Sequence, residues 1–248
     1  MAETKNLVQL IQFEPKTTRL IDGVMQKNYY KFDRQQAYEN FKNSAAYFAG
    51  FLMDMMAVGK SAPIINGMKL KWLKFIKTIM LYEDYEMDNS SSNFRDLNRF
   101  NELDYNDMPS LTLEQVSDMM DLDIDKMKQY RENRGNWGPN LWLFLHNTSF
   151  MVDGNQIFIE TFAGLMLNFN LVMYCSICVN GYVAKDPLQN VVIPMVESSD
   201  PITVIFQLHN LVNKSTNKPN LSIEAFCNLY NCNITDSESI SYSRVIVI

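Results

Sequence analysis

The sequence contains one pair of cysteines at the spacing of a redox motif, in the run Cys175-Ser176-Ile177-Cys178. Two intervening residues allow the two sulfurs to meet in a disulfide across the first turn of a helix. Unpaired backbone N–H groups and the helix dipole at such a turn stabilise a thiolate and lower its pKa. The motif therefore favours dithiol–disulfide exchange. A pair of buried thiols and half of a zinc site are the alternatives.

Two further cysteines, Cys227 and Cys232, extend the zinc alternative to a four-thiolate site. Their four-residue gap is at the wide end of zinc-ligand spacing, and they lie far along the chain from Cys178. We therefore expect no metal. A thioredoxin-like fold is not expected either, because no strand-rich βαβ pattern precedes the motif.

The first of the two histidines follows a tryptophan at helical spacing. Trp142 and His146 are four positions apart and share a helical face, with Gly138 one turn earlier. A flat cofactor could lie against this face, because Gly138 leaves room for close approach. A core tryptophan beside a hydrogen-bonded core histidine would give the same spacing.

The second histidine starts the run His209-Asn210-Leu211-Val212-Asn213-Lys214, which Lys218-Pro219 and Leu221-Ser222 follow. His209 and Asn213 again share a helical face, and imidazole and carboxamide groups can stack on and hydrogen-bond an adenine. Lys214 and Lys218 could pair with a pyrophosphate. A helix C-terminus rich in polar caps and lysines is the alternative.

In chain order, these three patterns resemble the Erv/ALR family of FAD-linked sulfhydryl oxidases. The similarity runs from about Gly135 to Phe226 as GxxxWxxLH, then CxxC, then HNxVNK with KPxLS after it. The resemblance implies a four- or five-helix bundle that binds FAD, with the CxxC disulfide beside the flavin ring. Cys178 would face the flavin, and Cys175 would exchange with substrate. The FAD contacts predicted in this way are Gly138, Trp142, His146, Cys178, His209, Asn210, Asn213, Lys214 and Lys218.

One departure from the family pattern is informative. Cellular members carry a structural disulfide on either side of the HNxVN helix, where this chain has Phe206 and residues near Ile223. Its absence resembles the viral branch of the family, found in large DNA viruses. Baculovirus-type members fuse a degenerate second bundle to the catalytic one, and the N-terminal segment here is similar in size and helicity.

The resemblance also implies an activity. Protein thiols would be oxidised by molecular oxygen, 2 RSH + O2 giving RSSR + H2O2, in a homodimer. A substrate thiolate would attack Cys175 and release Cys178, a step that a low pKa of the leaving sulfur favours. A viral enzyme would act on virion proteins in the cytoplasm or nucleus of the infected cell, and in the virion. Many members use a second, shuttle cysteine pair, for which Cys227 and Cys232 are the candidates; a local disulfide and two free thiols are the alternatives.

Composition excludes several other classes of protein. The 248 residues include 47% hydrophobic ones, enough for a core, and 22 basic against 28 acidic residues, which argues against nucleic-acid binding. Four cysteines are too few for a disulfide scaffold. The first residues contain no apolar segment of the kind found in secretory signals, so we expect no such signal. Residues 161–184 carry no charge, but Asn168, Asn170 and the adjacent Asp186 argue against a membrane span.

A change in charge density predicts the domain organisation, because 18 of the basic and 20 of the acidic residues precede position 135. We expect an N-terminal helical domain at 1–134 without cysteine or histidine, an oxidase domain at 135–235 and a tail at 236–248. The helices of the N-terminal domain should pack against the oxidase domain. The large N-terminal segment also supports the alternative of a non-enzymatic helical interaction protein with structural cysteines.

Hydrophobic periodicity predicts the helices that carry these residues. In the first segment we expect helices at 37–58, capped by Gly59, and at 68–85, then a loop at 86–110. A third helix at 111–130 should begin with a Thr112–Gln115 capping box. In the second segment we expect a helix from Pro139 through His146, another at 157–174, and one from Cys175 that Pro187 closes. After a polar loop, helices should follow at 201–213 and from Ser222, with a strand at 242–248.

Overall fold

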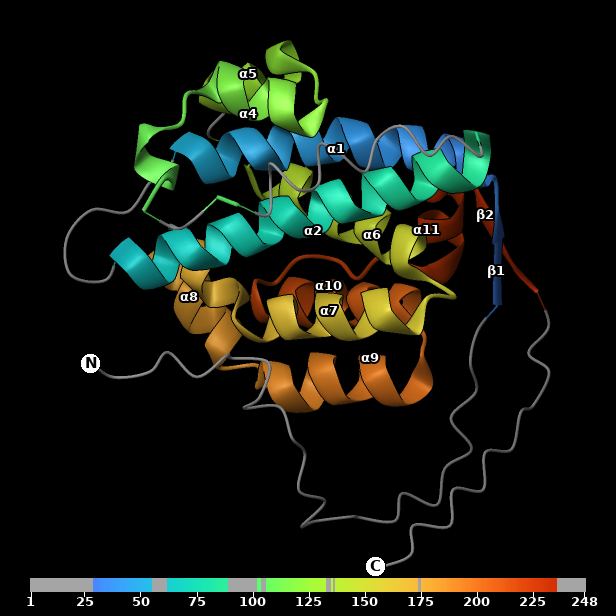
Figure 1. Cartoon of the computed structure of the whole chain (residues 1–248). Helices are drawn as coiled ribbons and strands as arrows, with labels where there is room; N and C mark the ends of the chain where they lie inside the picture. The colour runs from blue at the N-terminus through green and yellow to red at the C-terminus, as the bar shows by residue number, and fades with distance from the viewer. Residues whose placement is uncertain are drawn as a thin grey trace, which may run out of the picture.

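The computed structural model describes residues 29–54, 62–88, 102–103, 106–132, 135, 137–173 and 175–235. They form a mostly helical molecule, which confirms the all-α class (Figure 1). Within these ranges, no helix has both the length and the apolar character that a membrane crossing requires. The elements are β1 (Tyr29–Phe32), α1 (Arg34–Asp54), α2 (Ala62–Asp88), η3 (Met108–Ser110), α4 (Leu113–Met120), α5 (Ile124–Glu132), α6 (Trp137–Val152), α7 (Gln156–Leu167), η5 (Phe169–Val172), α8 (Ser176–Val183), η6 (Leu188–Val192), α9 (Ile193–Ser198), α10 (Pro201–Ser215), α11 (Ile223–Tyr230) and β2 (Cys232–Thr235).

Helices from both halves of the chain share one hydrophobic core. Trp72 of α2 is fully buried, and its ring meets Phe144 of α6 at 5.8 Å and Phe162 of α7 at 6.1 Å between centroids. Phe48 of α1 stacks on Phe144 at 4.1 Å. As expected, the described helices before residue 135 therefore pack against those after it.

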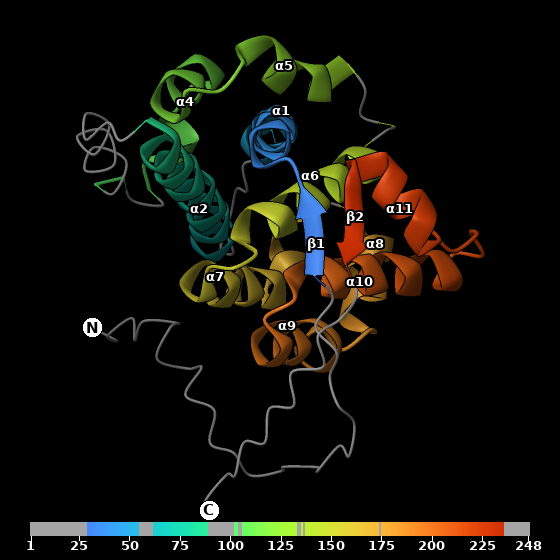
Figure 2. The same cartoon turned by 90° about the vertical axis from the view of Figure 1, so that its right-hand side faces the viewer.

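On its other side, α1 packs against α5 at a glycine. A Cβ added to Gly50 would lie 2.1 Å from the carbonyl oxygen of Met127, a distance at which no side chain fits. Gly50 therefore allows the two helix backbones to approach closely. In Figure 2, α4 and α5 lie outside α1 and α2, on the face away from α10.

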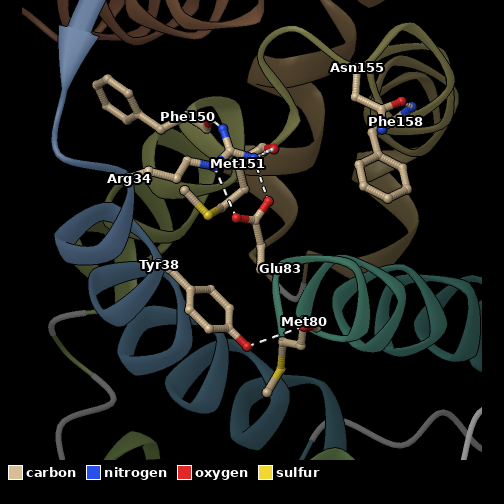
Figure 3. Close-up of polar contacts among 8 residues, drawn as sticks. All are labelled: Arg34, Tyr38, Met80, Glu83, Phe150, Met151, Asn155 and Phe158. Carbon is tan, nitrogen blue, oxygen red and sulfur yellow. Dashed lines mark hydrogen bonds and ion pairs between the residues drawn. The ribbon is translucent and has the colours of Figure 1, made fainter. Parts of the chain in front are cut away.

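A partly buried ion pair connects α1, α2 and the end of α6 (Figure 3). The guanidinium of Arg34 donates two hydrogen bonds to the carboxylate of Glu83, one of them 2.9 Å long from Nε. The Glu83 side chain is only 3% exposed. The same guanidinium donates to the carbonyl oxygens of Phe150 (3.2 Å) and Met151 (2.9 Å) in the last turn of α6. One side chain thus joins three helices.

The two strands form an antiparallel pair that joins distant parts of the chain. Tyr29 pairs with Thr235, and Phe32 pairs with Cys232. Figure 2 shows this pair beside α11, and Figure 1 shows it at one end of the molecule. The Tyr30 hydroxyl shares a 2.9 Å hydrogen bond with Thr203 of α10 and so attaches the pair to the helices.

The structure confirms most predicted helices and corrects others. Helices at 37–58 and 68–85 correspond to α1 and α2, whereas Gly59 lies outside the described residues. The capping box is present, with Gln115 N donating to Thr112 Oγ1 at 3.1 Å. A single helix at 111–130 is wrong: Asp121 has a left-handed backbone (φ 56°) that ends α4 before α5 begins.

The second half contains further differences. The helices predicted to pass through His146, to span 201–213 and to follow Ser222 are confirmed as α6, α10 and α11, and Ser222 caps α11. The helix at 157–174 ends at Leu167, and a 3-10 turn follows. The polar loop after Pro187 is wrong, because 188–198 forms a π-helical turn and α9.

The remaining local predictions concern the loop and the strands. The loop at 86–110 is wrong at both ends, since α2 continues to Asp88 and Met108–Ser110 forms a 3-10 turn. The strand at 242–248 and the tail at 236–248 lie outside the described residues. The two strands that the structure contains were not predicted.

Candidate functional site

The CxxC motif lies at the start of α8, as its spacing predicts. Cys175 is the N-cap residue, and its Sγ accepts a hydrogen bond from the backbone N–H of Cys178 at 3.3 Å. Both side chains are half-buried, and both are free thiols. The two cysteines therefore occupy the helix turn at which a thiolate is stabilised.

The two thiols differ in acidity. The pKa of Cys175 is lowered, first by the hydrogen bond from the Cys178 thiol and then by the backbone N–H groups of Cys178 and Ile177. Burial, together with the neighbouring Cys175 thiol, raises the pKa of Cys178 to about 11. In the dithiol form, the thiolate thus belongs to Cys175. This order is opposite to the one that would make Cys178 the better leaving sulfur.

The exposed face of α8, beside the motif, carries no charge. The exposed positions of α8 fall on one face of the helix, and Ile177, between the two cysteines, is 81% exposed. The exposed residues of this face and the following turn are Ser176, Ile177, Asn180, Val183 and Ala184. Cys175 therefore lies beside an uncharged, partly apolar face of α8.

Three side chains from the two histidine motifs, Trp142, His146 and His209, meet in one cluster, although 63 positions separate the histidines. Nε2 of His146 and Nδ1 of His209 share a hydrogen bond of 3.0 Å. The Trp142 ring stacks on His209, with centroids 4.1 Å apart and planes 8° from parallel. His209 of α10 thus meets α6 at the face that the spacing of Trp142 and His146 predicts.

Helix α11 covers the other side of His146. The rings of Phe226 and Tyr230 lie 5.2 and 5.1 Å from the imidazole, which is completely buried. The prediction from sequence missed both residues. Their four-residue spacing on the short helix after Ser222 was the available signal.

Burial keeps both histidines neutral. The pKa of His146 lies well below its ordinary value because the ring is buried and because His209 is adjacent. The pKa of His209 falls to about 4 through burial and the positive charge of Lys218. Nδ1 of His146 is buried and has no hydrogen-bond partner. Such a group is normally satisfied by a ligand or a water molecule.

The segment after α10 folds back toward the cluster. The side-chain amide of Asn210 donates to the carbonyl oxygen of Leu221 (3.0 Å) and accepts from its N–H (2.8 Å). The Asn213 carbonyl oxygen accepts from the backbone N–H of Lys218 at 2.9 Å. Asn210 therefore positions the segment that carries Lys218, whereas Lys214 is exposed in the last turn of α10.

The predicted site residues consequently divide into groups. Trp142, His146 and His209 are in contact, and Lys218 acts on His209 electrostatically. Gly138 lies one turn before Trp142, where an added Cβ would meet nothing within 4 Å. Among the described residues, no hydrogen bond or ring contact joins the CxxC pair to this cluster. Cys227 and Cys232 flank the turn between α11 and β2.

Comparison of the chain with models of known families, with curated proteins and with solved structures finds no match. Within the described ranges, no three histidine, cysteine or acidic side chains gather at a position that could hold a metal ion.

Proposed function

We propose that the chain is an FAD-dependent sulfhydryl oxidase of the Erv/ALR type, which oxidises protein thiols to disulfides at the expense of molecular oxygen. The observation that supports this most is the contact among Trp142, His146 and His209, because these residues come from two separate motifs of the family pattern. The third motif, CxxC, lies at a helix start that stabilises a thiolate. Under this proposal the enzyme is a homodimer of the viral branch and acts on virion proteins.

The residues of the cluster fit FAD in chemical character. Trp142 and His209 offer flat ring surfaces, and Nδ1 of His146 is a buried polar atom in need of a partner. Lys218 supplies a positive charge suited to a pyrophosphate, and the open space at Gly138 leaves α6 accessible. When bound, the flavin supplies the two-electron chemistry that links a dithiol to oxygen.

The CxxC pair performs the thiol exchange. A substrate thiolate attacks Sγ of Cys175, the Cys175–Cys178 bond breaks, and a mixed disulfide forms. A second substrate thiolate then attacks the substrate sulfur of that mixed disulfide and displaces Cys175 as a thiolate. The hydrogen bonds that lower the pKa of Cys175 stabilise this leaving group. The acidity of Cys175 therefore favours release of the oxidised substrate.

The purified full-length chain tests this proposal. It should be yellow, with an absorbance maximum at about 450 nm from bound oxidised flavin, and it should consume oxygen and form H2O2 when a dithiol is added. Cys175→Ser should retain FAD and lose thiol-dependent oxygen consumption. A colourless chain that FAD does not reconstitute would favour the interaction protein with structural cysteines.

A matched pair of variants on α6 tests the cluster itself. Trp142→Ala removes the ring that stacks on His209 and should yield mostly apoprotein. Leu143→Ala, at the next position, truncates a side chain that is 40% exposed and should retain FAD. Equal flavin content in the two variants would contradict the assignment of the cluster.

A further inference from the structure

Two cysteine thiols outside the CxxC motif lie next to each other. Cys227 is in the last turn of α11, and Cys232 is the first residue of β2. The backbone turns sharply between them, because Asn231 is left-handed (φ 50°) and its N–H donates to the carbonyl oxygen of Cys227. Cys232 directly follows Asn231, so the turn brings it back beside Cys227, and the neighbouring Cys227 thiol contributes to the raised pKa of Cys232. Cys232 is 3% exposed.

The position of this pair argues against electron relay to the CxxC motif of the same chain. Figure 1 shows α8 at one end of the molecule and α11 with β2 at the opposite end. Burial also raises the pKa of Cys232 to about 12, so that little of its thiolate forms near neutral pH. Cys227 is half-buried, so it is the thiol of this pair that a small disulfide reaches first.

The residues around Cys227 and Cys232 pack in the core and pair in the strands. Tyr230, between the two cysteines, packs against His146 and Phe150. Cys232 itself pairs with Phe32 of β1 in the strand register. A covalent bond across this turn would therefore link α11, which covers His146, to β2, which pairs with β1.

We propose that Cys227 and Cys232 form an intramolecular disulfide that clamps the turn between α11 and β2. Its formation by a small-molecule disulfide such as glutathione disulfide is balanced: the thiolate of Cys227 attacks one glutathione sulfur and releases glutathione. Cys232 then displaces the second glutathione, so that one S–S bond replaces another and two protons pass to the released thiolates. The turn at Asn231 holds the two cysteines at the same end of α11, which is the geometry that a short disulfide-closed loop requires. This proposal does not rest on the oxidase function.

The test uses the full chain with Cys175→Ser and Cys178→Ser, in which Cys227 and Cys232 are the remaining cysteines of the four. The protein is equilibrated with glutathione disulfide at pH 8, alkylated and analysed by mass spectrometry. The expected product has one internal disulfide, has lost two hydrogens and carries no glutathione. Persistence of the dithiol, or a stable glutathione adduct, would overturn the proposal.

Thermal unfolding tests the clamp. Oxidation should raise Tm by roughly 4–8 °C, as expected for a short closed loop in a chain of this size. The same protein with Cys232→Ser cannot close the bond, so its Tm should not respond to glutathione disulfide in this way. An unchanged Tm on closure would overturn the clamp, and a Cys232→Ser variant of the natural chain that loses only turnover of protein thiols would assign the pair to relay instead.

Discussion

The hydrogen bond between His146 and His209 needs one ring nitrogen to donate and the other to accept, so the two rings cannot both be protonated while it is intact. Histidine in the unfolded chain titrates at 6.5, whereas the pKa of His209 in the folded chain is about 4. Below pH 6.5 protons therefore bind preferentially to the unfolded chain, and the free energy of unfolding falls until about pH 4.

We predict that His209→Gln reduces this acid sensitivity. Between pH 7 and 5, the variant should lose about 1 kcal/mol less stability than the natural chain, a value discounted because the His209 ring is partly exposed. Urea unfolding at the two pH values measures the difference. Equal losses in the two proteins would show that His209 does not carry the linkage.

The acidity of Cys175 leads to a second prediction. Iodoacetamide should modify Cys175 faster than Cys178 near neutral pH, because the thiolate resides on Cys175. Cys178→Ala removes the thiol hydrogen bond and should slow modification of Cys175 by roughly three- to tenfold. Cys178→Ser keeps a hydroxyl donor and serves as the control. Peptide mass spectrometry gives both rates, and faster modification of Cys178 would contradict the assignment.

The sequence predicted side chains whose partners share a helix, and it missed those from other elements. Four-residue spacings predicted the faces of Trp142, His146 and His209. Tyr230 was missed because its contact with His146 depends on how α11 folds over α6. The amide of Asn210 engages Leu221, eleven positions along the chain, and that pairing has no signature in local periodicity.

At the scale of the helix, a substitution at Gly138 in the first turn of α6 should affect the stability of the fold and the binding of FAD in opposite directions. An alanine there meets no neighbour within 4 Å and removes backbone freedom from the unfolded chain. We predict that Gly138→Ala stabilises the chain by up to about 1 kcal/mol while lowering its FAD content. Chemical denaturation and flavin absorbance measure the two effects. A variant with unchanged flavin content would show that α6 does not approach FAD at this turn.

The Arg34–Glu83 pair should be a strong connection between helices, because Glu83 is buried. Glu83→Ala should cost about 2–3 kcal/mol, somewhat less than for a fully buried pair because Arg34 is 40% exposed. Glu39→Ala breaks an exposed pair with Lys42 on the same α1 and should cost at most about 0.5 kcal/mol. Urea unfolding compares them. Similar costs would show that Glu83 does not join the helices.

The sequence predicted helix boundaries correctly where a side chain caps the helix. It did not predict them where only the backbone conformation ends the helix. Thr112 and Ser222 were recognisable caps. Asp121 divides α4 from α5 by adopting a left-handed conformation that non-glycine residues rarely take. Pro187 looked like the end of a helix, but proline also fits a first turn, and a helical segment continues after it.

At the scale of the whole molecule, the core is assembled across the change in charge density at residue 134. We predict that a fragment of residues 135–248 is insoluble or poorly folded, because it would expose the faces of Phe144 and Phe162 that Trp72 covers. Expression, dye binding to exposed apolar surface and flavin content measure this. Trp72→Ala in the full chain should cost about 3–5 kcal/mol. A soluble, fully active fragment would show that the N-terminal segment is an independent module.

Amphipathic helices in the first segment predicted that it needs a packing partner. Periodicity could not say which helix would cover which, because matches such as Phe48 on Phe144 depend on the shapes of both surfaces. The strand pair was missed for a similar reason. Strands of four residues have little sequence pattern of their own, and these two form only because they pair with each other.

The pairing of β1 with β2 also has a consequence for biosynthesis. Tyr29 leaves the ribosome long before Thr235, so the N–H and C=O groups that face β2 stay unpaired while the helices between them are made. The β1–β2 pair is therefore completed after translation of residues 232–235, and pairing Phe32 with Cys232 encloses about two hundred residues of chain. During this interval the strand is a template for the β2 of another copy, and exchange of β2 between two copies is the misassembly that this topology favours.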